Sequence, residues 1–572
     1  MKRPTSWMIL TILLVFITLS SMYLYSERSI AWDDVQSADS INRYLDQMTL
    51  EEKVGQLLMP AIREMDGEPV TEMSGDLKKL IQTFKPGGII LFRENVDSRQ
   101  QLKQLNKSLQ KESELPLLIS IDQEGGLVTR LPYFPKLSGN MALAATRNSE
   151  LARETGQVIG AELKQVGIHI NFAPSVDVNN NPNNPVIGVR SFGDDPRLVS
   201  EMGAAFMNGL HDEGVMAVAK HFPGHGSVNM DSHYVLPVSE QSLDELKQTE
   251  LVPFQSMIEQ SVPGIMTAHI TFPNIDSSEF TSRKDGLPIK VPATLSPKIM
   301  NELLRKEMGF EGLIFTDSME MKAIADHFGP GEAAVQAVLA GVDVIVMPDH
   351  LKVAYDALIE AVEDERISEK RLDTSVRRIL KAKMDWVDPD LKEKPPYQAV
   401  QLEKKIAKQS VTLLSDQEEL LPLQEPFSGE ITLVASDGRN LESMKNALWK
   451  YHKKFHIVKL EALKNKNGSL SKDQLKLIED GDLTVLITDS STIVGEGDTS
   501  WEETVLTEVV RKSKQSILVM VRNPYDYDRL LGVDAAIAQY SDYHPSFQAT
   551  ADLIFGKIKA NGELPVKRLN EK

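Results

Sequence analysis

The chain has 572 residues, of which 41% are hydrophobic and 25% charged, a composition typical of globular domains with a substantial core. Its length predicts two or three domains. The net charge of −19 argues against nucleic acid or an anionic surface as the main partner, because both require a basic face. There is no cysteine, which excludes a disulfide, a thiolate nucleophile and a cysteine-based metal site.

The N-terminus has the pattern of an export signal. Lys2 and Arg3 precede an apolar run from Trp7 to Tyr25, which is long enough to span a bilayer as a helix. Ser29 to Ala31 form a tolerable small-x-small cleavage site, and the absence of cysteine excludes a lipoprotein anchor. We therefore expect residues 1–31 to be a signal peptide or an N-terminal membrane anchor, and the remainder to be extracytoplasmic, with membrane contact only through this segment.

Short apolar segments alternate with amphipathic helical patterns through residues 32–388. Strands that are apolar throughout are typical of parallel sheets covered by helices on both faces. About eight such units predict a (β/α)8 barrel. The predicted strands are Gln56–Pro60, Gly88–Phe92, Leu117–Asp122, Ile170–Val178, Val215–His221, Gly264–Ile270, Leu313–Asp317 and Val342–Pro348, and the clearest helices are Leu151–Val166, Pro196–Glu213 and Pro297–Glu307.

The composition changes at about residue 389, where a charged, proline-bearing segment predicts a linker over residues 389–408. Beyond it, short apolar strands again alternate with helical segments. The strands predicted there are Val411–Leu414, Ile431–Ala435, Leu483–Thr488 and Ile517–Val521. We expect residues 409–572 to form a smaller α/β sandwich domain whose role is mainly structural support.

Polar residues gather at the ends of the predicted barrel strands. In a barrel of this type, the carboxyl ends of all strands meet on one face, and that face holds the active site. Residues far apart in the sequence would therefore point into one bowl. The residues at or near strand ends are Asp122, Asp177, Lys220, His221, His269 and Asp317.

The densest cluster of ionisable residues runs from Lys220 to His233, directly after a buried strand. Within it, Asp231 and His233 are two positions apart on a glycine-containing loop. A carboxylate that accepts a hydrogen bond from one imidazole nitrogen fixes the tautomer and raises the basicity of the other. His233 is thus suited to donate and accept a proton near neutral pH.

Asp317 lies at the end of the seventh predicted strand, where a carboxylate can attack an electrophilic carbon, bind a cation, or simply cap a helix. Together with the Asp231–His233 pair, it suits cleavage of a glycoside with retention, in which the pair takes the place of the usual second carboxyl. Cationic and imidazole side chains available to hold hydroxyl, carbonyl or anionic groups of a substrate are Arg130, Arg190, Lys220 and His221.

Two other classes of function remain open. A metal-dependent hydrolase on the same barrel would use His221, His269 and Asp349, but the first strand carries no histidine pair to complete such a site. A non-catalytic cell-wall sugar-binding protein would need only the bowl.

Several segments together resemble the β-N-acetylglucosaminidases of glycoside hydrolase family 3. The resemblance covers nearly the whole chain after the leader, in the family's order. The segments are Asp122–Gly126 (DQEGG) with Arg130, Val186–Phe192 (VIGVRSF), Lys220–Gly226 (KHFPGHG) followed by Asp231–His233 (DSH), Phe315–Ser318 (FTDS), Ser410–Leu414 (SVTLL) and Gly562–Val566 (GELPV).

The resemblance implies a role for each matching residue. Asp317 would be the nucleophile, His233 the general acid/base and Asp231 its partner. Contacts with sugar hydroxyl and acetamido groups would come from Asp122, Arg130, Arg190, Lys220 and His221. No cofactor and no metal ion would be needed.

By the same resemblance, the substrate would be terminal non-reducing β-linked N-acetylglucosamine, removed from muropeptides during peptidoglycan turnover by a secreted or envelope-associated monomer. Some features depart from the family pattern. Leu127 follows Gly126 where some relatives carry arginine, and the stretch Asn274–Pro292 is longer than in compact members. Because an imidazole does not repel phosphate as a carboxylate does, phosphorolysis on the same site is the alternative to hydrolysis.

Overall fold

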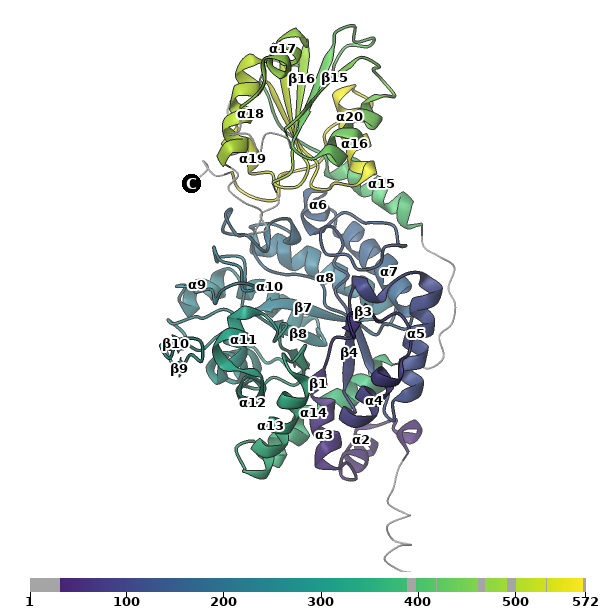
Figure 1. Cartoon of the computed structure of the whole chain (residues 1–572), viewed down its shortest axis with the longest axis vertical. Coiled ribbons are helices and arrows are strands. Elements are labelled where there is room, and N and C mark those ends of the chain that lie inside the picture. The colour runs from purple at the N-terminus through teal and green to yellow at the C-terminus, as the bar shows by residue number, and fades with distance from the viewer. Residues whose placement is uncertain are drawn as a thin grey trace, which may run out of the picture.

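The computed structural model describes residues 31–387, 398–417, 419–460, 469–490, 500–530 and 532–568. Two α/β domains lie one above the other along the longest axis (Figure 1). The predicted leader, up to residue 30, lies outside the described residues. Within the described part, no helix is both long and apolar enough to cross a membrane.

The first domain is built on parallel strands, as predicted, and a strand lies in each of the eight predicted segments. The sheet order is β11-β8-β7-β6-β5-β4 in one six-stranded sheet and β1-β12 in a two-stranded one. Backbone bridges Ala61–Ile90 and Phe315–Val344 connect the two sheets. The strands are β1 (Leu58–Met59), β4 (Gly88–Leu91), β5 (Leu118–Ile121), β6 (Ile170–Asn171), β7 (Met216–Phe222), β8 (Gly264–Thr267), β11 (Leu313–Phe315) and β12 (Ile345–Val346).

The fourth strand is much shorter than the predicted Ile170–Val178. It ends at Asn171, because Pro174 has no N–H with which to continue the ladder. The chain beyond it remains buried and stays beside β7, where the Val176 N–H donates to the carbonyl of Lys220 over 2.8 Å. The apolar composition of this segment therefore reflects burial rather than regular strand structure.

Helices cover the outside of these strands (Figure 1). Two of the predicted helices are confirmed, and each begins at a residue whose side chain accepts from the first turn: Asn148 caps α7 and Asp195 caps α8. The third, η5, is a π-helix. The helices of this domain are η1 (Trp32–Asp34), α2 (Ala38–Leu45), α3 (Leu50–Gln56), α4 (Gly75–Phe84), η2 (Arg93–Asn95), α5 (Arg99–Glu112), α6 (Asn140–Ala145), α7 (Ser149–Gln165), η3 (Gly188–Arg190), α8 (Pro196–Asp212), α9 (Leu243–Gln248), α10 (Leu251–Glu259), η4 (Ala293–Leu295), η5 (Lys298–Glu307), α11 (Lys322–Phe328), α12 (Pro330–Ala340), α13 (Leu351–Glu363) and α14 (Glu369–Trp386).

Two antiparallel hairpins extend from this framework. One pairs β2 (Glu64–Met65) with β3 (Glu68–Pro69), and the other pairs β9 (Glu279–Thr281) with β10 (Pro288–Lys290). The second hairpin falls within the long stretch Asn274–Pro292, which accounts for its length.

The second domain has a six-stranded sheet of order β13-β18-β17-β16-β14-β15, parallel except for β13. Apolar side chains alternate between its two faces: Leu433 joins one buried cluster and Val434 the other. The elements are α15 (Ala399–Ser410), β13 (Thr412–Asp416), β14 (Ile431–Ala435), α16 (Gly438–Leu448), β15 (Phe455–Lys459), α17 (Lys472–Asp480), β16 (Leu483–Thr488), α18 (Ser500–Lys512), β17 (Ser516–Met520), α19 (Asp526–Arg529), β18 (Ala535–Ala538) and α20 (His544–Ile554).

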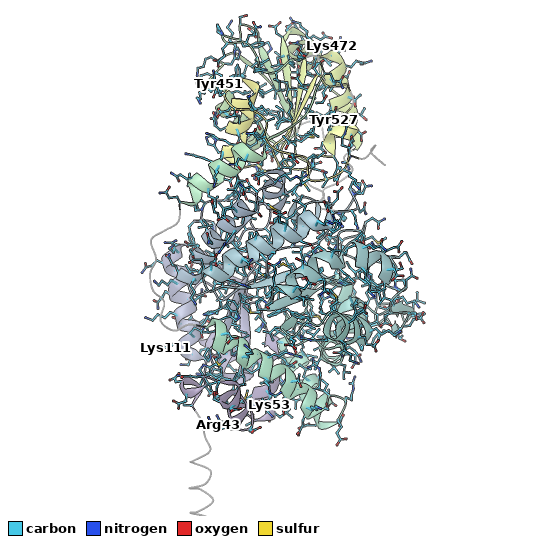
Figure 2. All side chains as sticks on the ribbon, turned by 180° about the vertical axis from the view of Figure 1, so that it is seen from behind. Arg43, Lys53, Lys111, Tyr451, Lys472 and Tyr527 are labelled. Carbon is cyan, nitrogen blue, oxygen red and sulfur yellow. The ribbon has the colours of Figure 1, made fainter. Side chains whose placement is uncertain are left out.

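The predicted linker 389–408 is helical from Ala399 onward, where it forms most of α15; residues 388–397 lie outside the described residues. Seen from behind, α15 leads from the first domain into the second, and Lys53 marks the end of the first domain remote from Lys472 (Figure 2). α15 also joins the domains directly, since the Glu403 carboxylate accepts two hydrogen bonds of 2.6 Å from Ser138.

Candidate active site

Lys220 is the centre of a buried ionic cluster at the carboxyl ends of the parallel strands. Its side chain is 2% exposed, and its Nζ lies 2.7 Å from Asp122 Oδ1 and 2.6 Å from Glu124 Oε1. Glu124 also accepts a bidentate pair from Arg190, with distances of 2.8 and 3.1 Å. Burial by itself would raise the pKa of Glu124, but the positive charges of Arg190 and Lys220 hold it well below its usual value.

A second pair joins His221 to Asp177, which is fully buried. His221 Nδ1 lies 2.7 Å from Asp177 Oδ2, while the backbone N–H groups of His221 and His225 donate to Oδ1. Burial would raise the pKa of Asp177, but the neighbouring imidazoles and N–H donors outweigh it and keep the carboxyl ionised. Asp177 therefore fixes the ring of His221 with Nε2 turned away from it.

The loop from Pro223 to Val238, called here the flap, carries the Asp231–His233 pair. Asp231 Oδ1 accepts from both Nδ1 and the backbone N–H of His233, over 2.7 and 2.8 Å. Within the flap, His225 Nε2 lies 3.1 Å from Ser232 Oγ, and the Ala323 N–H of α11 points at the Ser232 carbonyl. The His233 side chain itself is 58% exposed.

The hydrogen bond with Asp231 raises the pKa of His233, with burial acting against it and the negative charge of Asp317 adding to it. The acid form of His233 is therefore stabilised near neutral pH. The charges of His233 and Asp317 therefore each favour the ionised form of the other group.

Asp317 lies two residues beyond the end of β11, partly exposed, with Oδ1 accepting from the Ser318 N–H over 2.7 Å. Burial would raise its pKa, but the imidazole of His221 and the Ser318 N–H outweigh burial and lower it. His269 keeps this segment in place by hydrogen-bonding the Ser318 carbonyl over 2.9 Å. Asp317 is thus an ionised carboxylate just beyond the carboxyl end of β11.

Arg130 makes its described contacts with Phe92 and Gln123 and not with the ionic groups named above. Its guanidinium lies 5.3 Å from the ring centroid of Phe92, and its backbone N–H donates to Gln123 over 2.7 Å. The structure thus brings Asp122, Lys220 and Arg190 together around Glu124.

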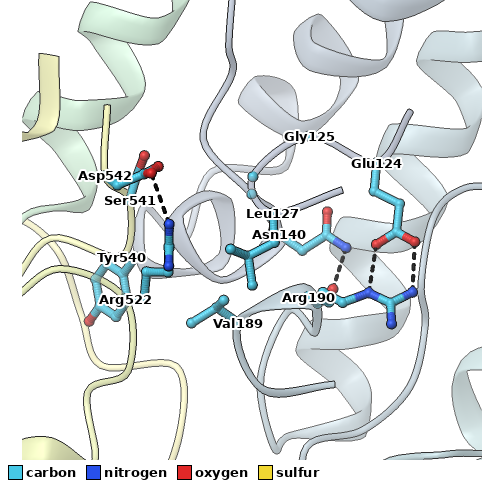
Figure 3. A pocket seen from close by; sticks show the side chains of 12 residues that line it. Glu124, Gly125, Leu127, Asn140, Val189, Arg190, Arg522, Tyr540, Ser541 and Asp542 are labelled. Atoms are coloured by element: carbon cyan, nitrogen blue, oxygen red, sulfur yellow. Dashed lines mark hydrogen bonds and ion pairs between the residues drawn. The ribbon is translucent and has the colours of Figure 1, made fainter. Parts of the chain in front are cut away.

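The second domain reaches this face of the first. A small cavity lies beyond the Glu124–Arg190 pair, with Arg522, Tyr540 and Asp542 of the second domain on its far wall (Figure 3). Arg522 is ion-paired with Asp542 over 2.8 Å. Because these groups face Arg190 without touching it, the second domain contributes to the surroundings of the site as well as to support.

Four residues of the site carried no predicted role: Glu124, Asp177, His225 and Ser232. Glu124 and Ser232 each lie inside a motif that pointed to the site, and Asp177 lies at a predicted strand end. Nothing in the sequence distinguishes a buried, fully paired carboxylate from an exposed one, so their roles follow only from the packing. Among the described residues, no group of three or more histidine and acidic side chains is arranged to hold a metal ion.

Residues 49–382 match the family model described as the glycosyl hydrolase family 3 N-terminal domain. The chain belongs to glycoside hydrolase family 3. A curated relative from Pseudoalteromonas piscicida, named beta-hexosaminidase A, is 31% identical over 587 residues, covering 91% of this chain and 97% of the relative. As a member of the family, the protein is a hydrolase enzyme.

Two solved structures extend the comparison. A family-3 β-N-acetylglucosaminidase from Paenibacillus sp. str. FPU-7 is 35% identical, with a TM-score of 0.79 over 91% of this chain and 99% of that one. A β-glucoside phosphorylase bound to 2FGlc is 26% identical, with a TM-score of 0.80 over 93% and 96% of the two chains. Both similarities span the two domains, so the arrangement of the whole chain is shared.

Proposed function

We propose that this family-3 protein is a retaining exo-β-N-acetylglucosaminidase. The observation that carries the proposal is the Asp231–His233 pair, hydrogen-bonded at 2.7 Å on a loop within electrostatic reach of the ionised Asp317. The names of the two relatives that cover nearly all of the chain, beta-hexosaminidase A and β-N-acetylglucosaminidase, support the same activity.

In the proposed first step, Asp317 attacks the anomeric carbon and forms a covalent glycosyl ester, while His233 gives its proton to the departing oxygen. In the second step, neutral His233 removes a proton from water, whose oxygen attacks the same carbon and releases Asp317. Asp231 stabilises the imidazolium form of His233 in both directions. The anomeric configuration is retained because the carbon is inverted twice.

Sugar recognition is assigned to the polar groups around the bowl. Lys220 and Asp122 can hold vicinal hydroxyls, and His221 can hold a hydroxyl through the nitrogen that faces away from Asp177. Arg190 and Arg130 are assigned to hydroxyl and acetamido oxygens. Each of these side chains except Arg130 is fixed in the structure by at least one ionic or hydrogen-bonded partner, so the site is preorganised for binding.

The substrates we propose are muropeptides, cut outside the cytoplasmic membrane during peptidoglycan turnover by a secreted or envelope-associated monomer. The N-terminal pattern of Lys2 and Arg3 followed by an apolar run supports export. We further propose that the two sheets of the first domain form one closed (β/α)8 ring and that the second domain is an α/β sandwich, since bridges join the sheets and buried clusters lie on both faces of the second.

Phosphorolysis is the second candidate. It is favoured by the 26% identity to a β-glucoside phosphorylase and by an acid/base that is an imidazole, which does not repel phosphate as a carboxylate would. Phosphate would then replace water in the second step and yield a sugar 1-phosphate.

One experiment separates these functions. Purified protein is incubated with 4-nitrophenyl β-N-acetylglucosaminide and with muropeptides, with and without phosphate, and products are identified by mass spectrometry and NMR. Free N-acetylglucosamine, released first as the β anomer, supports the retaining hydrolase. Sugar 1-phosphate formed at the expense of the free sugar supports the phosphorylase. Binding of the sugar without any bond cleavage refutes both and leaves a sugar-binding protein.

A further inference from the structure

The flap exposes an unusual amount of apolar surface. Of the eight large hydrophobic side chains exposed among the described residues, four lie on this one loop: Met230 (49%), Tyr234 (51%), Val235 (45%) and Val238 (48%). Clustered exposed apolar side chains mark binding surfaces more often than chance exposure. These four flank His233, the only residue of the flap assigned a proton transfer.

A lysine lies beside this apolar surface. Lys322, the first residue of α11, has its Nζ 6.0 Å from the ring centroid of Tyr234. The two are held together by the backbone, because the Ala323 N–H points at the carbonyl of Ser232 over 3.4 Å. An aromatic ring and an ammonium group therefore stand side by side next to the exposed His233.

The charge of Lys322 is available to a ligand. Asp326, one turn further along α11, is within electrostatic range but makes its ion pair with Lys284 over 2.8 Å. No ion pair to Lys322 occurs among the described residues. At 6.0 Å, the contact with the Tyr234 ring is at the limit of cation–π attraction and leaves the ammonium free to pair with an anion.

We propose that Tyr234 and Lys322 form the subsite for the leaving group, and that this subsite selects a sugar that carries a carboxylate. The argument rests on the proposed function. A general acid must come within hydrogen-bond reach of the glycosidic oxygen. The leaving sugar is bonded to that oxygen, so it lies against the groups that flank His233.

The two side chains match two parts of such a sugar. The Tyr234 ring can stack on the apolar face of a pyranose while its hydroxyl stays in water. Lys322 then attracts the carboxylate of an acidic substituent, as in a muramic-acid-type residue with its lactyl ether. The chain as a whole carries a net charge of −19 and would repel an anionic sugar. The unpaired Lys322 supplies a positive charge beside the catalytic acid, and this charge favours an anionic leaving sugar over a neutral one.

The test compares two disaccharides that share the same cleaved unit and linkage. One is N-acetylglucosaminyl-β-1,4-N-acetylmuramic acid, and the other is the neutral N,N′-diacetylchitobiose. The measured quantity is the ratio of kcat/KM for the acidic over the neutral substrate. Wild type is expected to favour the acidic one, and added salt is expected to weaken that preference.

Lys322→Met is expected to lower this ratio by about threefold, the scale of an exposed ion pair, while Lys322→Arg keeps it. Tyr234→Ala is expected to lower kcat/KM for both disaccharides by about fivefold, through lost stacking. The matched control is Lys352→Met, an exposed lysine of α13, which should leave the ratio at the wild-type value.

The other outcomes contradict either the subsite alone or the proposed function together with the subsite. If wild type cleaves both disaccharides and the ratio in Lys322→Met equals that of wild type, the subsite is wrong and the proposed function stands. If neither the disaccharides nor 4-nitrophenyl β-N-acetylglucosaminide is cleaved, the proposed function fails, and the subsite fails with it.

Discussion

Asp231 Oδ1 accepts two hydrogen bonds from one residue, His233, through its ring nitrogen at 2.7 Å and its backbone N–H at 2.8 Å. The double contact fixes both the position of the flap at this point and the orientation of the ring. It also leaves the other ring nitrogen of His233 to exchange protons with a substrate.

The first prediction concerns the pH dependence of this pair. The carboxylate of Asp231 raises the pKa of His233, so the acid form survives to higher pH and is lost as pH rises through that pKa. Asp231→Asn removes the charge, so the pKa of His233 falls and the alkaline limb of the kcat/KM profile moves to lower pH. The profile of 4-nitrophenyl β-N-acetylglucosaminide cleavage measures the shift. Asp356→Asn, on the exposed face of α13, is the control, and an unmoved alkaline limb in Asp231→Asn would contradict the pairing.

A second prediction tests whether His233 donates the proton to the leaving group. His233→Gln should lower kcat/KM for a disaccharide by roughly 10² to 10⁴, because the poor leaving group needs protonation. An activated aryl glycoside needs much less help and should lose far less. Equal losses for the two substrate types would rule out His233 as the general acid.

Asp317 is predicted to be indispensable. Replacing it with alanine removes the attacking oxygen and should lower kcat by at least about 10³, or ~4 kcal/mol of transition-state stabilisation, while the melting temperature changes little. Added azide should restore turnover and give a glycosyl azide of inverted configuration, because the small anion takes the vacated place. A fully active Asp317→Ala variant would end this assignment.

The hydrogen bond between His225 and Ser232 is predicted to position the pair above Asp317. Burial lowers the pKa of His225 to about 4, so it acts as a neutral hydrogen-bonding group throughout the working range. Ser232→Ala loses a contact of 3.1 Å and should lower kcat for a disaccharide up to about tenfold, with KM nearly constant. Ser232→Thr, which keeps a hydroxyl at the same position, should recover most of the loss. A change confined to KM would contradict a positioning role.

The sequence was sufficient to predict where the strands of the first domain lie, because strands buried between helices must be apolar. It also predicted which residues lie at the strand ends, because polar side chains stand out against an apolar run. The pattern alone therefore placed Asp317, Lys220 and His221 at or near the ends of strands. The strand β15 was missed because two of its five residues, His456 and Lys459, are polar, and β18 because its alanines are compatible with a helix. Both are strands through pairing with neighbours that are distant in the sequence.

The partners of the site residues could not be predicted in the same way. Glu124 and Asp177 matter because they are buried against Lys220, Arg190 and His221, and such pairings depend on the final packing of loops from different strands. The contact of the second domain with this face depends on the docking of two separate sheets, for which one sequence carries no periodic signal.

The last prediction concerns the contact between the domains at Glu403. Its carboxylate is 2% exposed and accepts two hydrogen bonds from Ser138, with no positive side chain among its described partners. Burial raises its pKa from 4.5 to about 7. The folded protein therefore holds a proton there that the unfolded chain releases, so this group's contribution to stability is complete below pH 4.5 and is lost as pH rises through about 7.

Glu403→Gln keeps the shape and can hydrogen-bond both groups of Ser138 without a charge. Its free energy of unfolding should equal that of wild type near pH 4.5 and exceed it at pH 8, by on the order of 3 kcal/mol for a pKa raised to about 7. Denaturant unfolding at a series of pH values measures the difference. Glu563→Gln, an exposed glutamate that pairs with Arg147 at the same domain junction, is the control and should show no such trend. A difference between Glu403→Gln and wild type that does not change with pH would mean that Glu403 is already ionised in the folded protein.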